Sequence, residues 1–149
     1  MADEVKNVPV AESKENAEAV AAPNNKFEPQ QYVTFDVSDI KNRVKIFNAH
    51  NSAVSFKTLE DKPINVVDVM TEIGVRSQSG NKCQNTYLFT DDNVYFTQSN
   101  GIGKTVNELV DMVAGDFKAN TTNGFVTVQL AETELSGDRT YKQLKLIAA

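Results

Sequence analysis

Short alternating runs of β-branched and aromatic residues, separated by Gly, Asn, Asp and Ser, dominate the sequence from Tyr32 onward. This alternation with a period of two is typical of β-strands, whose side chains point to opposite faces of a sheet. The runs that we expect to form strands span residues 41–48, 54–58, 64–75, 85–90, 94–98, 124–131 and 140–147. The sequence therefore predicts a mainly β domain.

Turn residues join two pairs of these runs into predicted hairpins. Residues 91–93, Asp-Asp-Asn, separate the runs over 87–90 and 94–97. The sequence Ser-Gly-Asp-Arg at 136–139 separates the last two runs. Asp, Asn and Gly favour tight turns because they adopt turn conformations at low cost. We therefore expect both pairs of strands to be antiparallel.

One helix is predicted between the strands. Thr105 and Glu108 match a capping box, in which the two side chains satisfy free amide donors at the start of a helix. The apolar residues that follow lie at helical spacing and form one stripe: Val106, Leu109, Val110 and Val113. Gly115 can adopt the left-handed conformation that ends a helix.

The order of several strands, one short helix and two long strands indicates a fold class. A domain of about 115 residues with this order fits a five-stranded Greek-key barrel of the oligonucleotide-binding (OB) type. The helix would lie between the third and fourth strands of that barrel. A small β-sandwich with an added helix is the alternative.

The first 31 residues differ from the rest in composition. They are rich in Ala, Glu, Asn and Val, and they contain three prolines and a single aromatic residue, Phe27. Such a segment buries too little apolar surface to offset the entropy lost on ordering it. We expect residues 1–31 to form a disordered acidic tail and residues 32–149 to form the domain. An amphipathic helix over 12–22 is the alternative for the tail.

The net charge excludes a protein that is basic overall. The chain has 15 Lys and Arg against 20 Asp and Glu, which gives −5. Six acids and three lysines lie in the tail, so −3 belongs to residues 1–31 and −2 to residues 32–149. A nucleic-acid binder with this charge needs a locally basic surface.

The sequence lacks the residues for a disulfide, a zinc cluster, a membrane helix or a secretory signal. One cysteine, Cys83, and one histidine, His50, allow neither an internal disulfide nor a zinc cluster, and neither residue has a catalytic partner at a telling spacing. We predict no enzyme activity, no metal and no cofactor. No run reaches about 18 apolar residues, and the first ten residues do not resemble a secretory signal. The protein is expected to be soluble and cytosolic, with no membrane contact.

A glycine-rich segment resembles the end of a phosphate-binding P-loop. It runs from Gly101 to Thr105, between a predicted strand and the predicted helix. Gln98 stands where the full pattern needs a glycine, and the expected architecture is antiparallel. We therefore interpret Lys104 as a loop cation and Thr105 as a helix cap.

The predicted first strand carries the most informative pattern for function. On a strand, alternate side chains share a face, which here would hold three cations and one ring: Lys41, Arg43, Lys45 and Phe47. Val44 and Ile46 would point to the opposite face. Cations that follow phosphates and rings that stack on bases suit a single nucleic-acid strand. A solvated strand face, on which lysines discourage edge pairing, is the alternative.

Other predicted strands also place rings and cations outward if their aliphatic faces line the barrel. We expect this of Tyr87, Tyr95, Tyr141 and Lys145. Phe89 and Phe125 could lie on the same outward faces or fill the core, since burial is the usual place for Phe. Each base that stacks on such a ring contributes about 1–3 kcal/mol with little regard to sequence.

Three segments resemble, in order and spacing, the single-stranded DNA-binding proteins of phi29-like bacteriophages. They are Arg-Val-Lys-Ile-Phe-Asn-Ala-His at 43–50, Ser-Phe-Lys-Thr-Leu at 55–59, and Lys-Thr-Val at 104–106 leading into Leu109, Asp111 and Val113. The resemblance covers residues 40–115, and 44–49 is its most specific stretch. The tail and the glycine-rich loop at 100–103 depart from the family pattern.

The resemblance implies a replication accessory protein that coats and protects displaced single strands in the host bacterial cytoplasm during phage DNA replication. Lys45, Phe47 and Lys57 fall inside the matching motifs and are implied to be binding residues. Further partners would be phage replication proteins such as the DNA polymerase and the terminal protein. A protein-interaction or virion module that uses the outward aromatic residues as a subunit interface is the alternative function.

Overall fold

The computed structural model describes residues 27–134 and 140–149. Residues 1–26 of the predicted tail 1–31, with its alternative helix, lie outside these residues. Residues 27–31 are described, and the Gln30 main chain donates to the Gln84 side chain and accepts from the Thr71 hydroxyl. The elements, in chain order, are β1 (Tyr32–Val33), α1 (Ile40–Ser52), β2 (Val54–Ser55), the 3₁₀ turn η1 (Phe56–Leu59), β3 (Ile64–Val66), β4 (Asp68–Val75), β5 (Lys82–Phe89), β6 (Val94–Thr97), α2 (Asn100–Met112), α3 (Phe117–Asn120), β7 (Val126–Glu134) and β8 (Thr140–Ala148).

The strands form two sheets, which confirms a mainly β protein. One sheet has five strands in the order β1-β4-β5-β6-β2, and the other has three in the order β3-β7-β8. All neighbours are antiparallel except β2 and β6, which are parallel. The predicted run over 64–75 divides at Val67, so that β3 and β4 belong to different sheets. A single five-stranded Greek-key barrel of the OB type is not confirmed by this arrangement.

Both predicted hairpins are present. Strand β5 pairs with β6 so that Phe89 lies opposite Val94, next to the turn at 91–93. Strand β7 pairs with β8 along most of their lengths, and the turn predicted at 136–139 lies outside the described residues.

The prediction of a strand over 41–48 is wrong, because these residues form helix α1. The Asp39 side chain accepts a hydrogen bond from the Lys41 amide and so caps the helix start. The apolar residues that dock the helix are Ile46 and Ala49, three positions apart, followed by Ala53 just beyond its end. The alternation of Val44 and Ile46 fits a strand equally well. The packing of Ile46, Ala49 and Ala53 against the sheet favours the helix.

Helix α2 starts six residues earlier than predicted. Ser99 caps it by accepting from the Ile102 amide, and Thr105 lies inside the helix, where its hydroxyl donates to the Gly101 carbonyl. The capping box at Thr105 and the loop position of Lys104 are therefore wrong. Gly103 lies close to the Phe27 ring, where a Cβ would come within 3.1 Å of it. Gly115 adopts the predicted left-handed conformation, with φ of 74° and its amide bonded to the Val110 carbonyl, but the helix ends earlier, at Met112, and Ala114 is the first left-handed residue after it, with φ of 52°.

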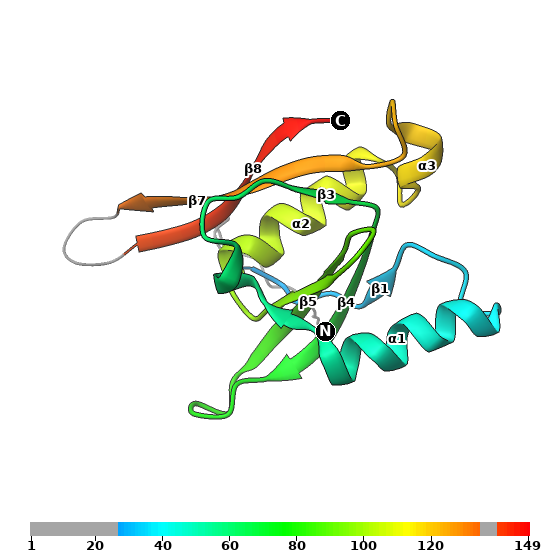
Figure 1. The fold of residues 1–149 in the computed structure, drawn as a ribbon. Coiled ribbons are helices and arrows are strands. Elements are labelled where there is room, and N and C mark those ends of the chain that lie inside the picture. The colour runs from blue at the N-terminus through cyan, green and yellow to red at the C-terminus, as the bar shows by residue number, and fades with distance from the viewer. Residues whose placement is uncertain (1–26, 135–139) are drawn as a thin grey trace, which may run out of the picture.

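Two hydrophobic clusters lie on opposite faces of the five-stranded sheet. The larger one is shared by both sheets and α2, and it buries the predicted α2 stripe together with Leu88, Val126 and Leu144. Helix α2 contacts both β5 and β8 and lies between the two sheets (Figure 1). The smaller cluster lies under α1 and includes Ala49 and Tyr87. Both faces of β5 are therefore covered.

Candidate nucleic-acid interface

The four residues expected on one strand face are separated by helix α1. Successive residues of an α-helix are rotated by about 100°, so Lys41 and Lys45 share one side while Arg43 and Phe47 share another. Lys41, Arg43 and Phe47 are exposed, and Phe47 keeps 67% of its surface in solvent. The continuous strip of three cations and one ring does not exist.

Lys45 is engaged in seating α1 on the sheet. Its Nζ atom lies 3.2 Å from a carboxylate oxygen of Asp68. The same ammonium group lies 4.3 Å from the centre of the Phe35 ring and 5.1 Å from that of Phe89. A cation over a ring face is attracted by the ring quadrupole, so these contacts hold Lys45 against the domain. A role for it in binding would compete with them.

The expectation that Tyr87 faces outward is wrong. Only 6% of its surface is exposed, and its ring packs 5.1 Å from Phe96 and 5.8 Å from His50. Burial, and then the negative charge of Glu72, raise the pKa of Tyr87 to about 12. The alternation rule failed here because α1 covers the face of β5 that sequence alone assigns to solvent.

The remaining predicted residues come from different elements of the fold. Tyr95 is half-buried, with its ring 6.4 Å from Phe56. Phe89 is buried and Phe125 is half-buried. Lys145 is exposed on β8, and the side chain of Tyr141 lies outside the described residues. Lys57 is exposed on η1 and lines the hollow described next.

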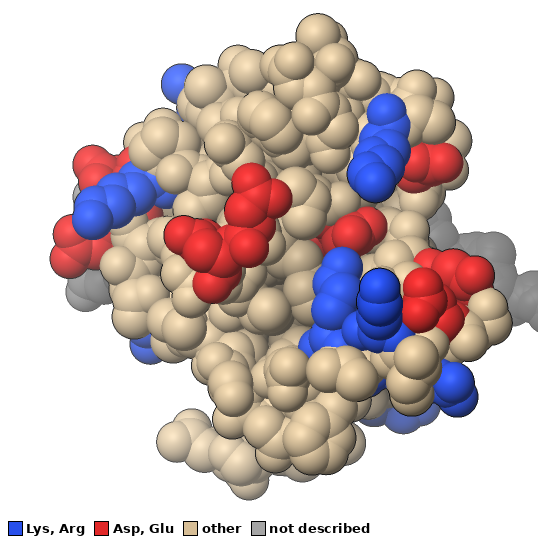
Figure 2. Space-filling model, turned by 45° about the vertical axis from the view of Figure 1, so that its right-hand side comes forward, with Lys and Arg blue, Asp and Glu red and all other residues tan. Residues whose placement is uncertain are grey.

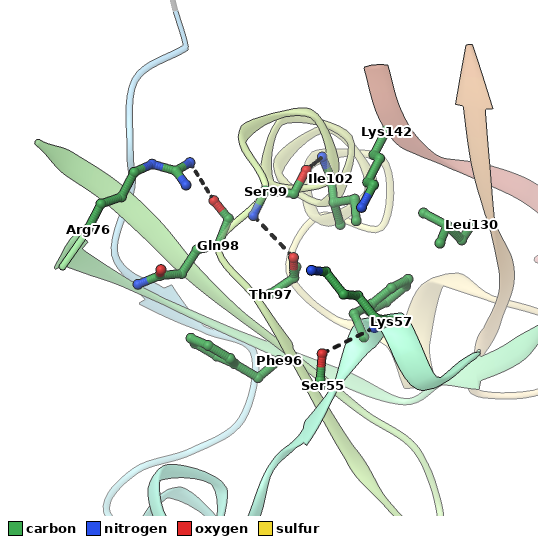
Figure 3. A pocket seen from close by; sticks show the side chains of 11 residues that line it. Ser55, Lys57, Arg76, Phe96, Thr97, Gln98, Ser99, Ile102, Leu130 and Lys142 are labelled. Atoms are coloured by element: carbon green, nitrogen blue, oxygen red, sulfur yellow. Dashed lines mark hydrogen bonds between the residues drawn. The ribbon is translucent and has the colours of Figure 1, made fainter. Parts of the chain in front are cut away.

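A hollow of about 430 Å³ lies where β2, η1, β6, the start of α2 and the β7–β8 pair meet (Figure 3). We call it the basic groove. Its lining includes three cations, Lys57, Arg76 and Lys142, and Phe96, whose half-buried ring packs on Tyr87 on the α1 side of the sheet. The other lining residues are Ser55, Phe56, Thr97, Gln98, Ser99, Ile102 and Leu130. Among the described residues that line it, none is acidic.

Other hollows in the described part of the chain mix both charges. A hollow of about 630 Å³ near α1 and α3 has Lys45 and Lys118 beside Asp68, Asp91 and Asp116. A third, of about 530 Å³ beside the 91–93 turn, has Lys45 with Asp91 and Asp92. Figure 2 shows the same mixture on the side that holds α1, where blue and red side chains lie beside one another. The basic groove thus differs from these two hollows in the sign of its charge, while an adjoining hollow shares Lys57 and Lys142 with it and adds Glu60, Asp61 and Glu132.

Arg76 is held at the edge of the basic groove by a chain of hydrogen bonds. Its guanidinium donates to the Gln98 carbonyl at 2.7 Å and to the Asn100 side chain at 3.2 Å. The Gln98 side chain in turn donates to the Asn85 side-chain oxygen at 2.9 Å. Asn85 lies directly over Gly74, where a Cβ would come within 2.6 Å of it. Figure 3 shows the Arg76 to Gln98 bond at one end of the groove and Lys142 at the other.

Sequence reasoning missed Arg76, Phe96 and Lys142. Lys142 shares the inward side of its strand with Leu144, so alternation alone assigns it to the core. It lies two residues beyond the buried part of β8, where the inward side opens into the groove. Arg76 directly follows β4, and a cation at the end of a long hairpin strand was the one available signal.

Two further findings concern other classes of site. Within residues 27–134 and 140–149, no three His, Cys, Asp or Glu side chains come together in a way that could hold a metal ion. In the same residues, no helix is long and apolar enough to cross a membrane.

Comparison with known proteins places the chain in a family. The family described as phage single-stranded DNA-binding protein, of the phi29 type, matches residues 27–145. Neither the curated proteins nor the solved structures contain a match. The matched region begins at the first described residue and includes α1, α2 and every strand lining the basic groove. The chain therefore belongs to the family of phi29-like phage single-stranded DNA-binding proteins.

Proposed function

We propose that the protein binds single-stranded DNA in the basic groove. The observation that carries this proposal is the lining of the groove: Lys57, Arg76 and Lys142 surround it, with no acidic side chain among the described lining residues. Family membership supports the same ligand.

The chemistry of the groove suits a flexible strand of any sequence. Phosphates contact the three cations, and such contacts do not depend on which bases the strand carries. Ser99 and Ile102 belong to the start of α2, where the positive end of the helix dipole adds a weak attraction for anions. Point charges do not read base edges, so binding is tolerant of sequence.

The biological role that follows is the coating and protection of displaced strands during phage DNA replication in the bacterial cytoplasm. No bond is made or broken in this role. The two sheets enclose one shared core with α2, as the walls of a partly open OB-type barrel do. We therefore keep the OB-type barrel as our interpretation of the architecture. Phage replication proteins are the partners that this role requires.

Titration of a labelled oligo-dT with the protein at several salt concentrations tests the proposal. Each neutralised phosphate contributes about 0.7 to the slope of log affinity against log salt for single strands. Replacing Lys57, Arg76 or Lys142 by Ala is therefore expected to lower the magnitude of that slope by about 0.7 in each case. Lys118→Ala is the matched control and should leave the slope unchanged, because Lys118 lines a different hollow that shares no residue with the basic groove.

Two outcomes would contradict the proposal. A wild-type protein that does not retard oligo-dT at low salt has no such function. Equal salt slopes for wild type and all three groove variants would place the DNA on another surface.

A further inference from the structure

Helix α1 presents an apolar stripe to solvent. Ile40, Val44 and Phe47 follow one another at helical spacing with 63%, 49% and 67% of their surfaces exposed. We call these three residues the α1 stripe. Val37, just before the helix, extends it with 46% exposure. Contiguous apolar side chains exposed to water mark an interaction surface.

The opposite side of α1 is fixed to the sheet, so the stripe cannot rotate inward. Ala49 is 1% exposed against β4 and β5, and Lys45 pairs with Asp68. Near the helix end, His50 pairs with Glu72. These contacts hold the stripe in one orientation.

Charge indicates what kind of surface covers the stripe. Lys41 and Arg43 are exposed on the two flanks of the stripe, and residues 40–52 contain no acid. Two such helices facing each other would bring four cations together, which is unfavourable. The complementary surface therefore has an apolar centre with acidic side chains around it.

The same chain carries a surface of this kind next to the basic groove. A hollow of about 510 Å³ shares Lys57, Leu130 and Lys142 with the groove and adds three acids: Glu60, Asp61 and Glu132. We call it the acidic end. Its half-buried Leu130 offers apolar contact, and its acids match the flanks of the α1 stripe.

We propose that the α1 stripe of one copy docks on the acidic end of a second copy when both are bound to the same DNA strand. This inference rests on the proposed function. Because the two surfaces differ, the contact is head to tail and repeats along the strand instead of closing into a dimer. Phosphates that engage Lys57 and Lys142 leave the three acids free to attract Lys41 and Arg43 of the neighbour.

The size of the stripe explains why DNA is needed. Its exposed side chains present on the order of 400 Å² with Val37, about half of the roughly 800 Å² per partner in a standard stable interface. Such a contact is weak between free copies. Copies held on one strand have an effective concentration in the millimolar range, where a weak contact forms.

The experiment compares two lengths of oligo-dT with the full-length protein. An oligonucleotide of about 10 nucleotides holds one copy, and one of about 60 holds several, so the ratio of the two affinities measures contacts between copies. Ile40→Ala is expected to lower that ratio several-fold and to leave the short-oligonucleotide affinity unchanged, and Phe47→Ala is expected to lower the ratio by about tenfold. Arg43→Glu and Asp61→Arg are each expected to lower the ratio several-fold, and the Arg43→Glu/Asp61→Arg double variant is expected to restore it.

Each other outcome overturns the proposal in a different way. Equal losses on both lengths for Phe47→Ala would show that the ring contacts DNA. An unchanged ratio for Phe47→Ala, or a double variant no better than the single ones, would exclude this pairing of surfaces. A peptide of residues 1–26 that lowers the ratio when added would assign the stripe to the tail. Failure of the wild type to bind either length would instead refute the proposed function.

Discussion

At the scale of single residues, the position of Arg76 depends on side chains that do not reach the groove. The Gln98 carbonyl holds the guanidinium, Asn85 holds the Gln98 side chain, and Gly74 leaves the space in which Asn85 lies. A long flexible cation that is already fixed loses less entropy when it contacts a phosphate. We therefore expect Gly74 and Asn85 to affect DNA binding through Arg76.

Gly74→Ala tests this chain of contacts. The new Cβ would come within 2.6 Å of Asn85 and displace its side chain from Gln98. We expect a loss of affinity for oligo-dT of about three- to tenfold, corresponding to about 0.6–1.4 kcal/mol for one lost neutral hydrogen bond. In an Arg76→Ala background, the same substitution should have little further effect. Full additivity of the two changes in a double-mutant cycle would show that Gly74 acts independently of Arg76.

At the scale of elements, α1 separates what local sequence determines from what packing determines. The hairpin around 91–93, the α2 stripe and the left-handed conformation of Gly115 are local patterns, and the structure confirms them. Residues 41–48 satisfy both periods, and the contacts of the helix with the sheet decide between them. Helix α1 buries Tyr87, so the wrong prediction of a strand over 41–48 also led to the wrong prediction that Tyr87 faces outward.

Two substitutions on α1 test which side of the helix is docked. Phe47→Ala removes an exposed ring and should change the free energy of unfolding by no more than about 0.5 kcal/mol. Ala49→Leu adds bulk at a position that is 1% exposed and should destabilise the protein by about 1–3 kcal/mol. Urea titration followed by circular dichroism measures both changes. A large loss for Phe47→Ala, with a neutral Ala49→Leu, would mean that the opposite side of α1 packs on the sheet.

At the scale of the whole molecule, the basic groove exists only because distant segments meet. Lys57 comes from η1, Arg76 from the end of β4, Phe96 from β6 and Lys142 from β8. No local pattern relates these positions, so sequence reasoning found only Lys57, through a family motif. The net charge of −5 does not reveal the groove either, because it is a sum over the whole chain. That sum includes both the groove, whose described lining has no acids, and surfaces where both signs mix.

The shared packing of the molecule also predicts how its stability responds to alkali. Burial is the main cause that raises the pKa of both Tyr32 and Tyr87 above the usual value of about 10, that of Tyr87 to about 12. The unfolded chain loses these phenol protons first, so their contribution to stability is complete below pH 10 and is lost as the pH rises towards 12.

The free energy of unfolding is therefore expected to fall between pH 10 and 12, and Tyr87→Phe should reduce that fall because the ring remains and the ionisable group is gone. Urea titrations at pH 8, 10 and 11.5 on wild type and Tyr87→Phe measure the difference. Tyr95→Phe is the matched control, since Tyr95 is only half-buried on the neighbouring strand. A Tyr87→Phe variant that loses stability between pH 8 and 11.5 as steeply as the wild type would contradict the prediction. Tyr87 would then ionise as readily in the folded chain as in the unfolded one, and its place beneath α1 would be wrong.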